Sequence, residues 1–122
     1  MNHYTLSKVN GMRMEQRASE MMGIDIVNKK WDGEKDGQRY EIKSCQKFVK
    51  NRRGRRRGRF TFKEEDFMDV NVIFIFLVHD ENGIIEGRKL SVREFLNWHL
   101  KVRLLNWREL FSIGIGETLK IE

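Results

Sequence analysis

The stretch from Trp31 to Cys45 reads WDGEKDGQRYEIKSC and combines a turn signal with the strand that follows it. The pair Asp36-Gly37 has the composition of a two-residue type I′ turn, in which both positions adopt positive φ. A hairpin closed by this turn sets Asp32 directly opposite Glu41. Directly opposed side chains have Cβ atoms roughly 4.5–5.5 Å apart, and like charges in such a pair are destabilising. The register therefore predicts two juxtaposed carboxylates, which need an explanation.

Two interpretations of this polar face stay open at the level of the residues. Lys30 and Lys43 share the face with Asp32 and Glu41, because alternate residues of a strand point to the same side. In the first interpretation the face is solvated and the two lysines neutralise the carboxylates. In the second, the carboxylates bind Mg²⁺, which takes oxygen ligands and completes its shell with waters and substrate phosphate. Lys43 would then stand beside the metal.

The flanking sequence predicts an α/β (α+β) fold around a mixed central sheet. Residues 10–23 carry apolar side chains at helical spacing and predict an amphipathic helix. Residues 24–30 alternate apolar and polar side chains and predict a strand that continues into the hairpin. Residues 60–69 indicate a strand end and a short helix, and residues 70–80 a strand covered on both faces. Residues 91–105 open with a capping box and predict a second long helix.

The run KNRRGRRRGR at residues 50–59 predicts a solvated basic loop that contacts nucleic acid. It holds no apolar side chain to bury and no acid. Its cations are Lys50, Arg52, Arg53, Arg55, Arg56, Arg57 and Arg59. Phosphates would neutralise this charge, whereas a localisation signal or a basic tail is less expected inside a domain. Phosphate contacts carry no sequence information, so the run does not distinguish duplex, junction or RNA.

Length and composition predict one domain over residues 1–122 with an anionic partner. The chain has 39% hydrophobic residues and a formal net charge of +6.

Cys45 is the only cysteine, so the chain can form neither an internal disulfide nor a cysteine zinc site, and Cys45 is expected to be a small, partly buried residue. No apolar run is long enough to cross a bilayer and the first residues lack a signal-peptide core, which favours a cytoplasmic protein without a membrane partner.

Asp32, then Glu41-Ile42-Lys43 on a strand, preceded by a helix bearing Glu15, resembles the PD-(D/E)xK nuclease superfamily. Restriction endonucleases and archaeal Holliday-junction resolvases belong to it. The wider sequence, YEIKSCQ, the arginine-glycine run, RFTF and VIFIFLV, is most similar to small archaeal or viral members. The resemblance covers roughly residues 10–79. It implies a restriction-endonuclease-like core, with the element order α-β-β-β-α-β and helices flanking the sheet.

The sequence departs from the family pattern before its first acid, where Trp31 replaces the usual proline. Asp25 and Asp36 are rivals for that acid. Asp36 is better explained by the turn, and only Asp32 faces Glu41 in the predicted register.

The resemblance implies a site residue by residue. Asp32 and Glu41 would bind Mg²⁺, or Mn²⁺ in its place, together with the backbone carbonyl of Ile42. Lys43 would position the attacking water or stabilise the transition state.

Two further residues match the pattern of the family. Glu15 corresponds to the helix acid, which reaches a metal through water or takes a second ion; the alternative is an exposed helix charge. Gln46, just past the strand, would contact the substrate or a metal-bound water. The resemblance implies a Mg²⁺-dependent endodeoxyribonuclease acting on duplex or branched DNA, and analogy adds a homodimer. The alternative is a non-catalytic nucleic-acid-binding module with the same fold and basic loop.

Overall fold

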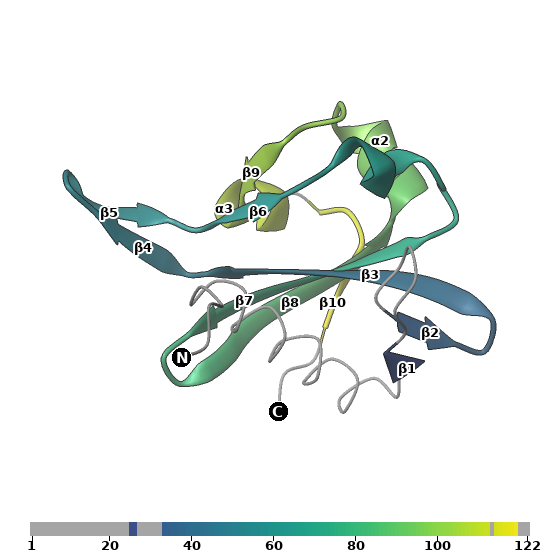
Figure 1. Ribbon diagram of the computed structural model, residues 1–122, viewed down its shortest axis with the longest axis horizontal. Coiled ribbons are helices and arrows are strands. Elements are labelled where there is room, and N and C mark those ends of the chain that lie inside the picture. The colour runs from purple at the N-terminus through teal and green to yellow at the C-terminus, as the bar shows by residue number, and fades with distance from the viewer. Residues whose placement is uncertain (1–24, 27–32, 113, 120–122) are drawn as a thin grey trace, which may run out of the picture.

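The structure, a computed structural model, describes residues 25–26, 33–112 and 114–119 of the chain (Figure 1). Its main strands are β1 (Asp25–Ile26), β2 (Gly33–Lys35), β3 (Gln38–Gln46), β7 (Ile73–Asp80), β8 (Gly83–Ser91) and β10 (Glu117–Thr118). Within the described residues these six strands form one mixed sheet in the order β1-β2-β3-β7-β8-β10.

The remaining elements pack beside this sheet or extend from it. They are β4 (Phe48–Asn51), β5 (Gly54–Arg57), β6 (Arg59–Thr61), β9 (Leu104–Asn106), the 3₁₀ helix η1 (Glu64–Phe67), α2 (Val92–Trp98) and α3 (Trp107–Phe111). β4 pairs with β5, and β6 pairs with β9. The predicted α+β class with a mixed sheet is therefore confirmed.

The hairpin between β2 and β3 closes as the sequence predicts. Asp36 and Gly37 have φ values of 52° and 79°, as a turn with positive φ at both positions requires. The observed pairs are Gly33 with Tyr40, Glu34 with Arg39 and Lys35 with Gln38. The register is thus confirmed for these three pairs. Lys30, Asp32 and the predicted helix with Glu15 lie outside the described residues, so the pair of Asp32 with Glu41 stays a prediction.

Parallel pairing between β3 and β7 forms the centre of the sheet. The register runs from Tyr40 opposite Ile73 to Gln46 opposite His79. β7 is buried along nearly its whole length, as predicted for a strand covered on both faces. Parallel neighbours need a long crossover, and here residues 47–72 supply it. β3 and this crossover carry the described candidate functional residues.

Aromatic side chains fill the layer on one face of the sheet. We call this set the aromatic layer; its members are Phe60, Phe62, Phe67, Phe74, Phe76 and Phe95. β6, β9, α2 and α3 lie on this side of the sheet (Figure 1). Cys45 is buried against the same layer, as expected, and burial raises the pKa of its thiol to about 12. A smaller cluster of Tyr40, Ile42, Ile75 and Leu77 lies on the opposite face.

The predicted long helix over residues 91–105 is wrong beyond its first two turns. The capping box forms, because Ser91 and Glu94 exchange hydrogen bonds of 2.9 and 3.0 Å between side chain and backbone. The helix then ends at Trp98, and His99 is extended with φ −135°. β9 pairs instead with β6, and the Arg103 carbonyl accepts a 2.9 Å hydrogen bond from the Phe62 amide. Strand pairing across the fold therefore overrides the local helical pattern.

Two other expectations about the elements also change. Of the strand predicted over residues 24–30, the structure describes only β1, which pairs antiparallel with β2 and is therefore a separate strand from the one that enters the hairpin. Between β3 and β7 the chain forms a β-hairpin, β6 and the 3₁₀ helix η1, where the family order would place an α-helix. In the described part of the chain, no helix is long and apolar enough to cross a lipid bilayer.

Candidate active site and nucleic-acid interface

Lys43 lies at the centre of a cluster of charged side chains on the aromatic face of the sheet. Its Nζ donates a 2.8 Å hydrogen bond to Oδ2 of Asp66 and lies 3.8 Å from Oε1 of Glu41. The same ammonium is 5.6 Å from the ring centroid of Phe62. The side chains of Lys43, Glu41 and Asp66 are only 15%, 16% and 9% exposed. We call these three residues the Lys43 cluster.

The position of Asp66 follows from the 3₁₀ helix η1. The Lys63 amide, at the N-cap of η1, donates a 2.7 Å hydrogen bond to Oδ2 of Asp66, which fixes the carboxylate over the first turn. Phe67 anchors the helix in the aromatic layer. Sequence reasoning missed Asp66 because it lies 23 residues from Lys43. The short helix was predicted, but nothing local indicates which strand its acid would reach.

A pocket of about 260 Å³ opens beside the Lys43 cluster, where Glu41 and Asp66 line it together with Glu65 and Asp69. Arg39 also lines the pocket and forms a 2.9 Å ion pair with Asp69. Carboxylate oxygens are donors that suit Mg²⁺. However, no group of three or more Asp, Glu, His or Cys side chains among the described residues is arranged to hold a metal ion. The oxygen donors of Glu41 and Asp66 are of the type that a hard cation takes, and both carboxylates are already close to the ammonium of Lys43.

The predicted loop at residues 50–59 is instead a β-hairpin, formed by β4 and β5 with Arg52 and Arg53 at its turn. The cross-strand pairs are Phe48 with Arg57, Val49 with Arg56, Lys50 with Arg55 and Asn51 with Gly54. Asn51 Oδ1 accepts a 2.9 Å hydrogen bond from the Arg53 amide, and Gly54 takes a φ of 116°. The prediction of a loop is wrong, because the backbones of these residues pair as two strands even though most of the arginine side chains stay exposed to solvent. We call this element the basic hairpin.

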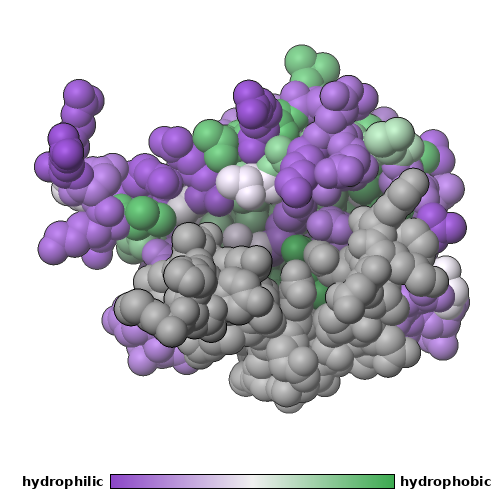
Figure 2. Space-filling view, viewed as in Figure 1, coloured by the Kyte–Doolittle hydropathy of each residue, from purple (hydrophilic) through white to green (hydrophobic). Residues whose placement is uncertain are grey.

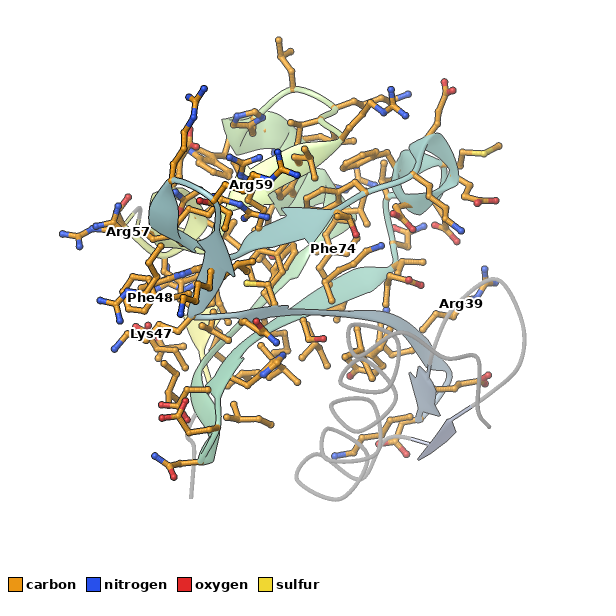
Figure 3. The ribbon with its side chains drawn as sticks, turned by 60° about the vertical axis from the view of Figure 1, so that its left-hand side comes forward. Arg39, Lys47, Phe48, Arg57, Arg59 and Phe74 are labelled. Atoms are coloured by element: carbon orange, nitrogen blue, oxygen red, sulfur yellow. The ribbon has the colours of Figure 1, made fainter. Side chains whose placement is uncertain are left out.

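The side chains of the basic hairpin form two faces. Phe48, Lys50, Arg55 and Arg57 share one face, because directly paired residues lie on the same side. There the Arg55 guanidinium stacks 4.1 Å from the Phe48 ring centroid, and Lys47 Nζ lies 5.7 Å from it. Figure 3 shows Phe48 and Arg57 together, at the opposite end of the molecule from Arg39. The aromatic ring therefore holds cations in place on a strand pair that has no acidic residue.

The base of the basic hairpin is tied to the body of the protein at Lys47 and Gly58. The Gly58 amide donates a 3.1 Å hydrogen bond to the Lys47 carbonyl, which also accepts a 2.8 Å hydrogen bond from Trp107 Nε1. A Cβ atom at position 58 would overlap the backbone carbonyl of Gln46. Only glycine can pass this close to the Gln46 backbone, so the packing of the two backbone segments fixes the direction of the hairpin.

A second pocket, of about 490 Å³, lies at this base. Gln46 lines it together with Thr61 and two arginines of the basic run, Arg56 and Arg59. Gln46 lies three residues beyond Lys43 on β3, and its odd spacing places the two side chains on opposite faces of the strand. The structure thus groups Gln46 with the basic hairpin and Glu41 with Lys43, while Glu15 and Asp32 lie outside the described residues.

No protein-family model matches this sequence, and no curated protein shows significant similarity to it.

Proposed function

We propose that the protein is a Mg²⁺-dependent endonuclease that hydrolyses phosphodiester bonds in DNA. The observation that carries this proposal is the Lys43 cluster, in which Asp66 of η1 meets Glu41 and Lys43 of β3, the strand that leads directly into the basic hairpin. An acid and a lysine two residues apart on a central strand match the ExK pattern of the PD-(D/E)xK superfamily. The hairpin supplies the positive charge that a DNA substrate requires.

The proposed roles divide between binding and charge stabilisation. Glu41, Asp32 and the Ile42 carbonyl would hold Mg²⁺, and Glu15 would add a further oxygen. When bound, the ion supplies an activated water and offsets charge on the scissile phosphate. Lys43 would orient the attacking water or stabilise charge developing on the phosphate, where a preorganised donor in a partly buried site is most effective.

Asp66 supports this assignment because it holds the ammonium of Lys43 in one place. A lysine side chain has four rotatable bonds, so an unheld Lys43 would lose entropy each time it adopted the productive geometry. The 2.8 Å hydrogen bond to Asp66 restricts that motion before substrate arrives.

A second candidate is a non-catalytic nucleic-acid-binding module. It is favoured by the pairing of Lys43 with both Asp66 and Glu41, since a purely structural ion-pair cluster has the same contacts. In this case the basic hairpin alone carries the function. The two candidates differ in what happens when Lys43 is removed.

A cleavage assay tests the proposal with supercoiled plasmid, linear duplex, single strand and a four-way junction, each with Mg²⁺, Mn²⁺ or EDTA. Removing the metal should abolish cutting while most binding remains. Lys43→Ala should lower the single-turnover rate by on the order of 10²-fold or more, with little change in DNA affinity. Lys101→Ala, an exposed lysine, is the matched control.

The outcomes separate the candidates. Cleavage that persists undiminished in excess EDTA would remove the metal from the proposal. Parallel, modest losses of rate and affinity in Lys43→Ala would show that Lys43 has no catalytic role. If wild-type protein binds all four substrates and cuts none of them in either metal, the binding module is the better description.

A further inference from the structure

We infer that the basic hairpin is a two-stranded ribbon that enters the major groove of B-form duplex DNA. This inference rests on the DNA-binding part of the proposed function and names the form of nucleic acid that the site accepts. It is carried by the shape of the hairpin, the distribution of its side chains and the rigid attachment at its base.

The basic hairpin projects from the body of the protein. In Figure 1, β4 and β5 extend away from the sheet as a narrow arm, and in Figure 2 the same arm is a purple, hydrophilic projection. Each strand has four residues, so the arm reaches roughly 13 Å at about 3.3 Å per residue. The major groove of B-form DNA is about 8.5 Å deep and about 12 Å wide. The arm is therefore long enough to reach the floor of the groove.

The width of the arm fits the major groove of DNA and not the minor groove. A pair of strands is about 4.8 Å across between backbones, and side chains broaden it on both faces, which the major groove accommodates. The minor groove, about 6 Å wide, is too narrow for such a ribbon. Double-stranded RNA has a deep and narrow major groove that protein elements cannot enter. The geometry thus favours duplex DNA over duplex RNA.

The side chains of the hairpin suit this placement. Arg52 and Arg53 occupy the turn, are exposed and would reach the base edges first. Arginine is the residue that pairs best with guanine through two parallel hydrogen bonds in the major groove. Lys50 and Arg57, exposed on the same face of the hairpin, are placed to contact phosphates that border the groove.

Two features at the root of the hairpin keep the arm presented to a ligand. Arg55 stacked on Phe48 stiffens the strand pair, and the packing of Gly58 against Gln46 fixes its direction. A preformed arm loses less conformational entropy on binding than a flexible basic loop. The pocket at its base, lined by Arg56 and Arg59, leaves room for the phosphate backbone that borders the groove.

The test measures binding in EDTA, so that it does not depend on cleavage. Four probes share one sequence: duplex DNA, duplex RNA, single-stranded DNA, and duplex DNA whose cytosines carry glucosylated hydroxymethyl groups that fill the major groove. We expect the unmodified duplex to bind best and the glucosylated duplex to bind at least about tenfold more weakly. Netropsin, which occupies the minor groove, should leave binding unchanged.

Variants assign the effect to the arm. Arg52→Ala combined with Arg53→Ala should weaken duplex binding by at least about tenfold and reduce the penalty caused by glucosylation. Arg93→Ala combined with Arg108→Ala, which changes exposed arginines on α2 and α3, is the control and should bind like wild type.

Three results would overturn the inference: equal affinity for plain and glucosylated duplex, displacement of the protein by netropsin, or equal affinity for duplex RNA. The outcome is separate from that of the proposed function. A protein that binds in the major groove but cuts nothing would keep the inference and lose the endonuclease. A protein that cuts DNA but tolerates glucosylation would do the reverse.

Discussion

Replacing Asp66 with asparagine should lower the free energy of unfolding by about 1.5–3 kcal/mol, the range measured for hydrogen bonds to charged groups. The substitution removes the charge that Lys43 contacts at 2.8 Å. It keeps a side-chain oxygen for the Lys63 amide, so the cap of η1 is retained. The expected loss therefore reports on the Lys43 interaction and not on the helix.

The size of the effect follows from burial. A pair exposed to solvent contributes about 0–1 kcal/mol, whereas breaking a fully buried pair costs about 3–5 kcal/mol. Lys43 and Asp66 are 15% and 9% exposed, which places the pair near the buried limit. Glu41 stays 3.8 Å from the ammonium after the substitution and offsets part of the loss. We therefore expect the loss in the free energy of unfolding to lie between the values for an exposed pair and a fully buried pair.

The measurement is urea unfolding followed by circular dichroism, with a double-mutant cycle that adds Lys43→Met. The chain offers a matched control in the pair of Arg39 and Asp69, which has a similar length of 2.9 Å but side chains 47% and 41% exposed. Asp69→Asn should cost at most about 1 kcal/mol. If Asp66→Asn costs no more than Asp69→Asn, or the cycle shows no coupling, the Lys43 cluster is not the preorganised site described above.

Three further outcomes are expected. Replacing the arginines of β5, Arg55, Arg56 and Arg57, with alanine should weaken DNA binding and flatten its dependence on salt; an unchanged slope in a salt titration would show that the hairpin points away from the ligand. Cys45, with a pKa raised to about 12 by burial, should not react with a thiol reagent at pH 8 in the folded protein; rapid modification without urea would contradict that burial. Asp32→Asn should raise the melting temperature of the metal-free protein, and Mg²⁺ should stabilise wild type more than the variant; an equal response to the metal would place Asp32 outside the site.

Local chemistry made parts of this fold predictable. The Asp36-Gly37 turn fixes its own register, because few residue pairs adopt positive φ at both positions. The capping box at Ser91 starts α2 for a similar reason, since both partners lie within one helical turn. The position of Glu41 and Lys43 on one face of β3 follows from the same hairpin. Each of these features is determined by residues close together in the chain.

Pairing between distant segments was not predictable in the same way. Residues 104 and 105 end the helical pattern predicted over 91–105, yet they belong to β9 and pair with β6, where Leu105 lies opposite Phe60, 45 residues away along the sequence. The contact of Asp66 with Lys43 depends on how the crossover folds over the sheet. The arginine run shows no alternation of apolar residues, so nothing in it signals a strand pair. In each case the structure of a segment depends on a distant segment that it pairs with or contacts, and not on its own sequence alone.

The hydrogen bond between Gly58 and Lys47 bears on which changes in the length or sequence of the hairpin the fold can accept. It joins the two ends of the basic hairpin, so residues 48–57 leave and re-enter the body of the protein at one point. An insertion with adjacent ends can be lengthened, shortened or exchanged with little effect on loop-closure entropy, which grows only slowly with loop length. The sheet and the Lys43 cluster would stay intact through such an exchange. The arm therefore joins the body of the protein at a single point, where it could be replaced as a unit.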